Sequence, residues 1–556
     1  MGVRLAPGTA DAPVVALGEP ISFWGGVDPA TGAVIDARHP QRGAALAGRV
    51  VVLAGTRGSC TGSGVLLDLA LGGRAPAALV LRDAEAVATL GALVAAEMFD
   101  RPVPVIRLGA ADHARAARAA RLRVEPDRVL IDGVPVPLAA PAADGVALSA
   151  TERAMLDGAD GPAAARAMRL IVAMAAAQGA PSLIPVARAH IDGCIYAAPA
   201  FLRFAEAMLA LGARVRVPTT TNAISVDRDR WRARGTDPAF GVPAAALADA
   251  YVAMGARPSF TCAPYLLADA PRAGEAVAWG ESNAVVYANA VLGARTAKLP
   301  DFLDLCAAVT GRAPRAGVYE DAGRRPARVV SVDWPAEAEG AAWPLLGWLL
   351  GRAAPDRVPL VTGLERAAPS ADDLKALCAA FGTTSGAPML HLAGITPEAR
   401  TPPMADADAV RIGRDALRDG WDRLNAGPDA IDLVALGAPH LSLTEVRAAA
   451  ALMAGGRCAV PCIATLGRDV LAAARAEGLL AVLEAAGVTV VPDLCWCSIT
   501  EPVLPPGARV VLTNSGKYAH YGPGLHGRTV RLAGLDACAA AARTGRAPAA
   551  RPVWLG

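Results

Sequence analysis

Three cysteines in polar surroundings are the side chains in this sequence with the clearest chemical potential. Cys194 in "HIDGCIY", Cys262 in "FTCAPY" and Cys495 in "DLCWC" each follow an apolar run that is typical of a buried strand. Thiolates from separate strand ends can hold an iron–sulfur cluster and leave an iron position open for a substrate. Taken singly, each can instead be a buried packing residue, and the C-x-C spacing of Cys495 and Cys497 does not decide between the two.

Lysine is rare in this chain, which draws attention to the few that occur. Only Lys298, Lys375 and Lys517 are present, and arginine supplies all the other basic residues. Lys517 follows the apolar run "VVLT" in the segment "TNSGKYAHYGPG". A compact ammonium group at a strand end is suited to a substrate carboxylate or phosphate, whereas a solvated lysine without a ligand is the alternative.

A loop of small residues, "GTRGSCTGSG" at 55–64, lies between a predicted strand over 49–54 and a predicted helix over 64–72. Its backbone N–H groups and the helix N-terminus can bind an anion. No lysine follows Gly62, and the glycine spacing does not match the dinucleotide fingerprint, so the pattern is not that of a nucleotide-binding loop. A tight polar turn without a ligand is the alternative.

The segment "WGESNAVVYANAVLGART", residues 279–296, places polar side chains in an otherwise apolar helical run. Glu281 and Asn283 are among them. Buried polar groups need hydrogen-bond partners, so these side chains either cap neighbouring loops or line a polar pocket.

The elements that position these residues begin with alternating strands and helices over 46–107. Such alternation predicts a parallel or mixed sheet flanked by helices. A strand pair over 121–133 follows, and "PVPLAAPAADG", residues 135–145, is predicted to be a linker. Ser149 or Thr151 is the predicted N-cap of the next helix.

We therefore predict a small domain over residues 1–143 and a large region of repeated α/β modules over 144–556. Within the large region, three segments each run from an amphipathic helix through a glycine into a short strand. Their ends carry Asn222, Cys262 and Cys495. Ligands of open α/β sheets bind at such strand ends.

The composition narrows the range of partners. The 54 basic and 52 acidic residues nearly balance and aromatic residues make up 4%, so we expect no nucleic acid partner. No charge-free apolar run reaches the roughly eighteen residues of a membrane span, and the first residues lack a signal-peptide pattern. We predict a cytoplasmic protein with reduced cysteines, no membrane partner and small molecules as ligands.

Taken together, several segments closely resemble the aconitase X family, dehydratases of the aconitase superfamily. The resemblance covers residues from about 16 to 553 and rests on motifs in the family's order: "GTRGSCTGSGVLLDLA", "AHIDGCIY", "VRVPTTTN", "FTCAPY", "GESNAVVYANAVLGART", "AVTGRAP", "GITPEA" and "TNSGKYAHYGPG". It implies an α/β, aconitase-like fold in which a small swivelling β/α domain precedes a large multi-module α/β region.

The resemblance also implies an activity. A single chain is similar to the bacterial form of the family, a hydro-lyase that converts cis-3-hydroxy-L-proline to Δ1-pyrroline-2-carboxylate. The archaeal form has two subunits and dehydrates mevalonate 5-phosphate. Dehydration of mevalonate 5-phosphate and a role as a non-catalytic iron–sulfur sensor stay open as alternatives. The expected assembly is a monomer or a small homo-oligomer.

By the same resemblance, Ser63 is the expected base that removes the Cα proton. Lys517 is expected to hold the substrate carboxylate with Ser59 and the loop amides around Gly62. His190 is a further catalytic candidate. The other candidates for lining the substrate pocket are Asp192, Asn222, Glu281, Asn283 and Ser515.

The expected cofactor is an iron–sulfur cluster of the [2Fe-2S] type, with Cys194, Cys262 and Cys495 as its ligands. The chain departs from the family pattern at two positions. Relatives read G-C-P-H where this sequence has Ala438, so no thiolate can come from that position. Cys497 stands where relatives have an aromatic residue, and it is either an incidental thiol or a replacement ligand.

Overall fold

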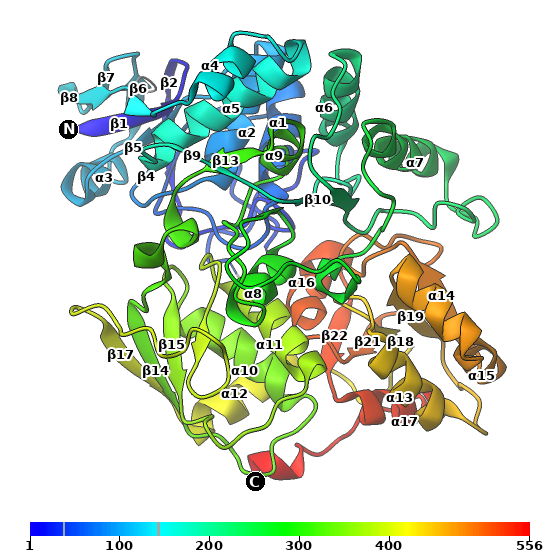
Figure 1. Ribbon diagram of the computed structural model, residues 1–556. Coiled ribbons are helices and arrows are strands. Elements are labelled where there is room, and N and C mark those ends of the chain that lie inside the picture. Colours follow the sequence, from blue (N-terminus) through cyan, green and yellow to red (C-terminus); the bar gives the residue numbers. More distant parts are fainter. Residues whose placement is uncertain (37–38, 142–144) are drawn as a thin grey trace.

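The computed structural model describes residues 1–36, 39–141 and 145–556, and Figure 1 shows its ribbon. The domain boundary predicted at residue 143 lies outside the described residues. The N-terminal part forms a closed barrel with strand order β1-β5-β4-β3-β2-β6-β7-β8. Its strands are β1 (Gly2–Ala6), β2 (Ala10–Ala16), β3 (Val50–Leu53), β4 (Ala78–Leu81), β5 (Val105–Arg107), β6 (Arg121–Val124), β7 (Arg128–Ile131) and β8 (Val134–Ala139).

The predicted alternation of strands and helices over 46–107 is confirmed. Strands β2 to β5 pair in parallel, and their connections contain α1 (Gly62–Leu71) and α2 (Val87–Phe99). A third helix, α3 (Ala110–Ala116), precedes the antiparallel pair β6–β7, which is the predicted strand pair. Four buried apolar residues make up β3, as expected for a strand covered on both sides.

The linker prediction for residues 135–145 is wrong in its first half. Residues 134–139 form β8, which pairs with β7 and closes the barrel by a parallel pairing with β1. Val136 and Leu138 alternate inward between exposed residues, which is strand periodicity. Pro135 and Pro137 hid this pattern, because proline is typical of linkers and rare within strands.

The first module of the large region holds a parallel three-stranded sheet of β11 (Thr219–Thr221), β10 (Ala189–Ile191) and β12 (Ala278–Trp279). Two further strands pair antiparallel with each other: β9 (Leu183–Pro185), which precedes this sheet in the sequence, and β13 (Arg312–Pro314), which follows it. The helices are α4 (Ala150–Leu156), α5 (Pro162–Gln178), α6 (Pro199–Ala210), α7 (Pro238–Ala253), α8 (Ser282–Ala290) and α9 (Leu303–Thr310). The predicted N-cap Ser149 is confirmed, because its side chain accepts from Glu152 N in a capping box.

Two further parallel sheets follow. One has the order β16 (His391–Leu392), β15 (Pro359–Thr362), β14 (Arg328–Val332), β17 (Asp408–Ile412), with α10 (Ala342–Ala353), α11 (Ala371–Thr384) and α12 (Arg414–Leu424). The other has the order β20 (Val488–Pro492), β19 (Cys462–Leu466), β18 (Leu433–Leu436), β21 (Val510–Thr513), β22 (Thr529–Leu532). Its helices are α13 (Leu443–Met453), α14 (Arg468–Ala476), α15 (Leu479–Ala485), α16 (Gly516–His526) and α17 (Leu535–Thr544).

The barrel and the first module share one apolar core. A single cluster of buried side chains extends from Leu5 in β1 to Tyr319 beyond β13. At the contact of α1 with α6, a Cβ on Gly64 would lie 2.0 Å from the ring of Phe201. The barrel is therefore docked by close packing that only glycine permits at this point. In Figure 1, α8 and α16 lie near the centre, between the barrel and the two C-terminal sheets.

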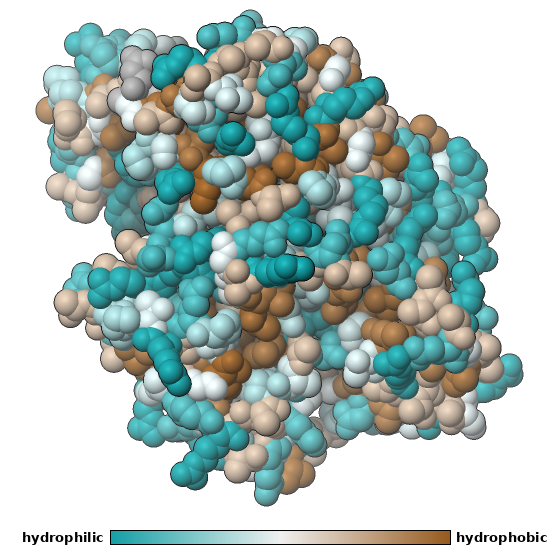
Figure 2. Space-filling model, in the orientation of Figure 1, coloured by the Kyte–Doolittle hydropathy of each residue, from teal (hydrophilic) through white to brown (hydrophobic). Residues whose placement is uncertain are grey.

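Hydrophilic and hydrophobic residues are interspersed over the face of the molecule shown in Figure 2. Among the residues that the structure describes, we find no helix with the length and hydropathy that a bilayer crossing requires.

Candidate active site

Ser63 lies in the first turn of α1, at the end of the serine loop, which we define as residues 55–64. It is fully buried. Its hydroxyl lies 3.0 Å from the carbonyl oxygen of Cys60 and 3.0 Å from that of Asp301, which belongs to the large region. Asp301 N in turn donates to Cys60 O at 3.3 Å. The structure thus brings the predicted base against the first module.

The rest of the serine loop is shaped by close backbone packing. Ser59 Oγ donates to Thr61 Oγ1 at 3.0 Å. Gly62 begins α1, and a Cβ there would lie 3.0 Å from Val87 Cγ1. Gly58 has a φ of +82°, and a Cβ on it would lie 2.9 Å from the hydroxyl of Tyr521 in α16. The loop backbone therefore approaches α16 closely because its glycines carry no side chains.

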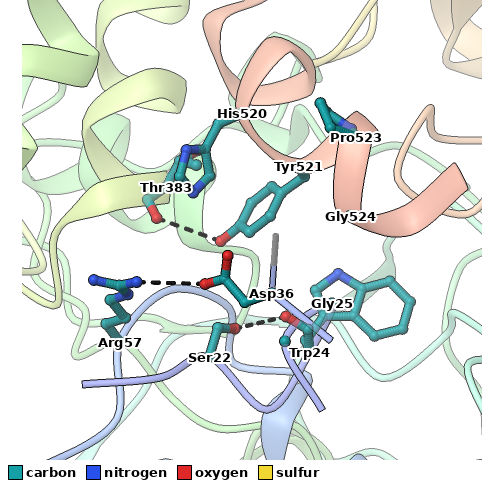
Figure 3. Close-up of a pocket in the computed structure, with 11 residues that line it drawn as sticks. Ser22, Trp24, Gly25, Asp36, Arg57, Thr383, His520, Tyr521, Pro523 and Gly524 are labelled. Carbon is teal, nitrogen blue, oxygen red and sulfur yellow. Dashed lines mark hydrogen bonds and ion pairs between the residues drawn. The ribbon is translucent and has the colours of Figure 1, made fainter. Parts of the chain in front are cut away.

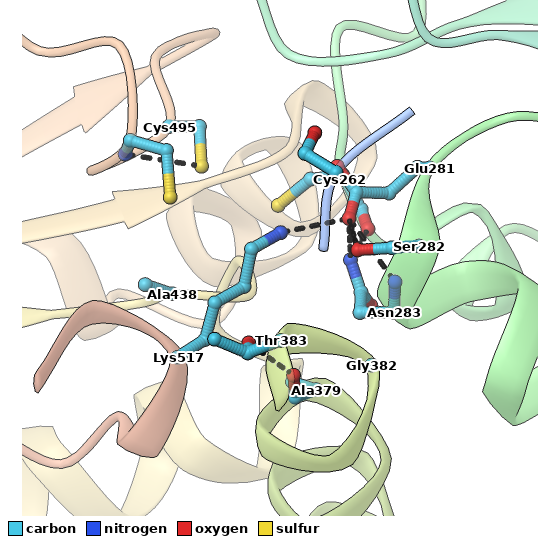
Figure 4. A network of polar contacts seen from close by, with 12 residues as sticks. Cys262, Glu281, Ser282, Asn283, Ala379, Gly382, Thr383, Ala438, Cys495 and Lys517 are labelled. Carbon is cyan, nitrogen blue, oxygen red and sulfur yellow. Dashed lines mark hydrogen bonds and ion pairs between the residues drawn. The ribbon is translucent and has the colours of Figure 1, made fainter. Parts of the chain in front are cut away.

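A buried ion pair joins two helix N-termini across the large region, as Figure 4 shows. Lys517 Nζ, in the first turn of α16, lies 2.7 Å from Glu281 Oε1, at the N-cap of α8. Burial opposes charge on both groups, but the Lys517 ammonium holds the pKa of Glu281 below its ordinary value. The carboxylate in turn raises the pKa of Lys517 well above its usual range despite desolvation. Both side chains are therefore charged at neutral pH.

Two more of the predicted residues donate to Glu281, and a third joins them through Asn222. Asn283 Nδ2 donates to Glu281 Oε1 at 2.7 Å and to Cys262 O at 2.9 Å. Asn222 Nδ2 donates to Glu281 Oε2 at 3.3 Å and also to Asp192 Oδ1. These contacts connect the end of β11 and the start of α8, which Glu281 caps, in one buried polar network.

His190 and Ser515 have more local contacts. His190 Nδ1 lies 2.7 Å from Thr220 Oγ1, and desolvation lowers the pKa of this histidine to about 3, so the ring is neutral. Its Nε2 has no hydrogen-bond partner among the described residues. Ser515 is the N-cap of α16, where its hydroxyl accepts from Tyr518 N and donates to Ala438 O. Its side chain is therefore engaged in capping and in fixing the loop that holds Ala438.

Two buried carboxyl groups beside this network, Asp301 and Asp304, were missed by the sequence reasoning. Asp304 accepts from the backbone N–H of Asp192 at 2.6 Å and from that of Leu305 at 2.7 Å. Burial raises the pKa of Asp304 to about 6. Burial, and then repulsion from neighbouring carboxylates, raises the pKa of Asp192 and of Asp301 well above the usual range. The available signal was "LPDFLDL", two acids within an apolar run.

Three cysteines come together: Cys262, Cys495 and Cys497 belong to one small buried cluster. The neighbouring thiols of Cys262 and Cys497 hold the pKa of Cys495 well below its ordinary value. Backbone N–H groups also donate to these sulfurs: His440 N to Cys262 Sγ at 3.3 Å, and Cys497 N to Cys495 Sγ at 3.5 Å. Cys495 follows β20 as predicted, whereas the segment before Cys262 forms only an isolated bridge at Arg257.

Cys194, by contrast, is not brought to the other two predicted ligands. It packs in the apolar cluster that the first module shares with the barrel, and its Sγ lies 3.3 Å from Ile191 O. The thiol that accompanies Cys262 and Cys495 is Cys497.

Thiols are the donors that an iron–sulfur cluster requires, and Cys262, Cys495 and Cys497 supply three of them. In the described part of the chain, no three His, Cys, Asp or Glu side chains are arranged to hold one metal ion. A two-iron cluster divides its ligands between two metal atoms, so it does not need three donors around one point. Hydrogen bonds from backbone N–H groups to the sulfurs are the contacts that stabilise cluster thiolates, and both Cys262 and Cys495 receive them.

A surface pocket lies where the barrel domain meets α11 and α16, as Figure 3 shows. It encloses about 480 Å³ of space, part of it open to solvent. Arg57, from the serine loop, lies on one side and is 3.4 Å from Asp36 Oδ2. Tyr521 lies on the other side and also contacts the cysteine cluster. The pocket therefore adjoins the buried site through Tyr521, and sequence reasoning singled out neither Arg57 nor Tyr521.

Comparisons with known families match nearly the whole chain. The aconitase X swivel domain matches residues 1–132, and the first, second and third aconitase X domains match residues 145–322, 326–422 and 431–544. The cis-3-hydroxy-L-proline dehydratase of Pseudomonas aeruginosa is 50% identical over 99% of this chain and 97% of its own length. The enzyme of the same name from Hypocrea jecorina is 44% identical over 98% of this chain and 95% of its own length.

More distant relatives match a smaller share of the chain. The phosphomevalonate dehydratase large subunit of Methanothermobacter thermautotrophicus is 34% identical over 69% of this chain and 95% of its own length. The crystal structure of aconitase X from Thermococcus kodakaraensis, a holo-form, superposes with a TM-score of 0.66 at 30% identity. The match covers 72% of the present chain and 100% of the Thermococcus chain.

Proposed function

The chain belongs to the aconitase X family, and we propose on this basis that it is a hydro-lyase that dehydrates cis-3-hydroxy-L-proline. The observation that carries this proposal is the 50% identity to a dehydratase of that substrate over almost the full length of both chains. The two subunits of the relative named for phosphomevalonate match this chain only in part: the large subunit is 34% identical over 69% of it, and the small subunit is 42% identical over 18% of it. The product would be Δ1-pyrroline-2-carboxylate, formed when the initial enamine tautomerises.

The reaction removes a proton from Cα and hydroxide from C3, which leave together as water. Ser63 is the proposed base, acting as an alkoxide or as a proton relay stabilised by the N–H groups of the serine loop. Lys517 would bind the substrate carboxylate with N–H groups that its contact with Glu281 leaves available. Ser59 and the amide of Gly62 would assist from the loop.

The polar network around Glu281 would orient the substrate ring. Asn222 and Asn283 are held by Glu281, so their positions are fixed before the substrate arrives. Asp192 joins the same network through Asn222. His190, neutral at physiological pH, would accept or donate a proton at Nε2. Ser515 would act indirectly, by capping the helix that carries Lys517.

The proposed cofactor is an iron–sulfur cluster of the [2Fe-2S] type, with Cys262 and Cys495 among its ligands. When bound, it would supply a Lewis acid for the C3 hydroxyl. The side chains described above would bind, orient and deprotonate the substrate. We place the enzyme in the cytoplasm, as a monomer or a small homo-oligomer acting on a small molecule.

The test is anaerobic purification followed by separate assays with cis-3-hydroxy-L-proline and mevalonate 5-phosphate. We expect turnover of the first substrate alone. Cys262→Ser should abolish both visible absorbance and turnover, whereas Cys306→Ser, in the apolar helix α9, should retain both. Turnover of mevalonate 5-phosphate alone would overturn the proposal. A visible cluster without turnover of either substrate would favour a sensor.

A further inference from the structure

We propose that Cys497 is the third thiolate ligand of the cluster in this chain, beside Cys262 and Cys495. This inference rests on the proposed function, because that function supplies the cluster. It assigns a ligand role to a cysteine whose type and C-x-C spacing left its role undecided.

The first support is the arrangement of the three thiols. Cys495 has both Cys262 and Cys497 as its neighbours in one cluster. All three side chains are buried, and they share one apolar cluster with Ala223 and Tyr521. Three thiols within one small cluster of five buried residues form a set of possible sulfur ligands.

The second support is the environment of the sulfurs. Cys497 donates its own backbone N–H to Cys495 Sγ, so the C-x-C turn folds both side chains toward the same space. Backbone N–H groups thus point at two of the three sulfurs, those of Cys262 and Cys495, as they do around the thiolates of a cluster.

The third support is the loop that carries Ala438. His440, two residues further on, donates its N–H to Cys262 Sγ, and Ser515 donates to Ala438 O. Figure 4 shows Ala438 beside Lys517 and the cysteines. This loop therefore borders the same site, but its methyl group cannot ligate iron. Cys497 is the thiol that the fold places in one cluster with Cys262 and Cys495.

Cys194 is the competing third ligand, and the structure argues against it. Its thiol donates to Ile191 O, and it packs in a different apolar cluster from Cys262. The sulfur of Cys194 is therefore engaged outside the cluster that contains Cys262, Cys495 and Cys497.

The experiment compares iron and acid-labile sulfide per chain, together with the visible spectrum, after anaerobic reconstitution. We expect Cys497→Ser and Cys497→Ala to lose iron and sulfide several-fold, and Cys194→Ser to retain both. Cys378→Ser is the matched control for a buried cysteine outside the site. Thermal unfolding of the unreconstituted proteins identifies any variant that fails to fold.

A rescue variant makes the test specific for ligation. Ala438→Cys in the Cys497→Ser background places a thiol in the loop that borders the same site, so we expect much of the iron and sulfide to return. Full iron in both Cys497 variants would overturn the inference, as would loss in Cys194→Ser alone. Those results would not affect the proposed function, which is tested separately by turnover of cis-3-hydroxy-L-proline in the wild type. If wild-type protein that contains no iron turned over the substrate, both the proposed cofactor and the ligand role of Cys497 would be overturned.

Discussion

Ser63 Oγ lies 3.0 Å from the carbonyl oxygen of Asp301, a residue 238 positions later in the chain. The contact is reinforced in the opposite direction, because Asp301 N donates to Cys60 O. The proposed base is thus positioned by the large region and not by the barrel alone. Removal of the Cα proton should therefore depend both on the Ser63 hydroxyl and on the docking that places it.

The first prediction concerns the hydroxyl itself. Ser63→Ala should lower kcat by about 10²- to 10⁴-fold, the range of a lost general base, while KM changes little because the loop amides remain. Exchange of the Cα hydrogen with deuterated solvent gives the independent measurement. Continued rapid exchange in Ser63→Ala would rule out Ser63 as the base. Cys60→Ala is the control in the same loop and should stay largely active.

The second prediction concerns docking. Gly64→Ala would ordinarily stabilise a helix by about 0.5–1 kcal/mol, but here the new Cβ would lie 2.0 Å from the Phe201 ring. We expect a lower thermal midpoint and a lower kcat, since the serine loop moves away from Asp301. Gly109→Ala is the matched control, because its Cβ would meet nothing within 4 Å. If the clash with Phe201 causes the loss, adding Phe201→Ala to Gly64→Ala should restore part of the activity. A double variant no more active than Gly64→Ala would contradict this explanation.

The third prediction concerns the ion pair. Lys517→Met leaves Glu281 buried without its cation, which should destabilise the protein by about 3–5 kcal/mol and abolish turnover. Without Lys517, burial would raise the pKa of Glu281 above its value in the unfolded chain. The loss of folding stability in Lys517→Met should therefore be larger at pH 7 than at pH 5. The double variant Lys517→Met/Glu281→Gln should regain stability without activity. Wild-type kinetics in Lys517→Arg would show that the ammonium plays no part in binding.

The fourth prediction concerns pH. The pKa of Asp304 is about 6 in the folded protein against an ordinary value of 3.8, chiefly because of burial. The folded state holds this proton where the unfolded chain has released it, so stability falls as pH rises from about 4 to about 6. Relative to Asp304→Asn, the wild type should lose at most about 3 kcal/mol over that window. Thermal midpoints of both proteins between pH 4 and 7 provide the measurement.

The control for this prediction is Asp127→Asn, which alters a carboxyl whose side chain is 72% exposed. Its thermal midpoint should follow that of the wild type at every pH. Parallel curves for Asp304→Asn and the wild type would contradict a raised pKa at Asp304.

Local patterns predicted much of the fold. The strand-and-helix alternation of 46–107 and the capping box at Ser149 depend on nearby residues, so they are visible in sequence. β8 was missed because Pro135 and Pro137 have the local preferences of a linker, and only pairing with β1 and β7 makes this segment a strand.

The site was harder to predict, because it is built from contacts between distant segments. The motifs pointed to Ser63, Lys517 and Glu281, but nothing local indicates that Lys517 pairs with Glu281 or that Asp301 holds the serine loop. Similarly, the C-x-C spacing does not reveal that Cys497 lies beside Cys262. Those relations arise from the tertiary fold, in which three modules meet around α8 and α16.

The covalent connection between β8 and α4 has a kinetic consequence. Because the barrel and the large region are parts of one chain, docking of the serine loop is an intramolecular event with a fixed effective concentration. Specific activity should therefore be insensitive to dilution of the enzyme, even if the two parts separate and re-dock in each cycle. A barrel supplied as a separate polypeptide would lose this advantage, and its activity would fall as the mixture is diluted.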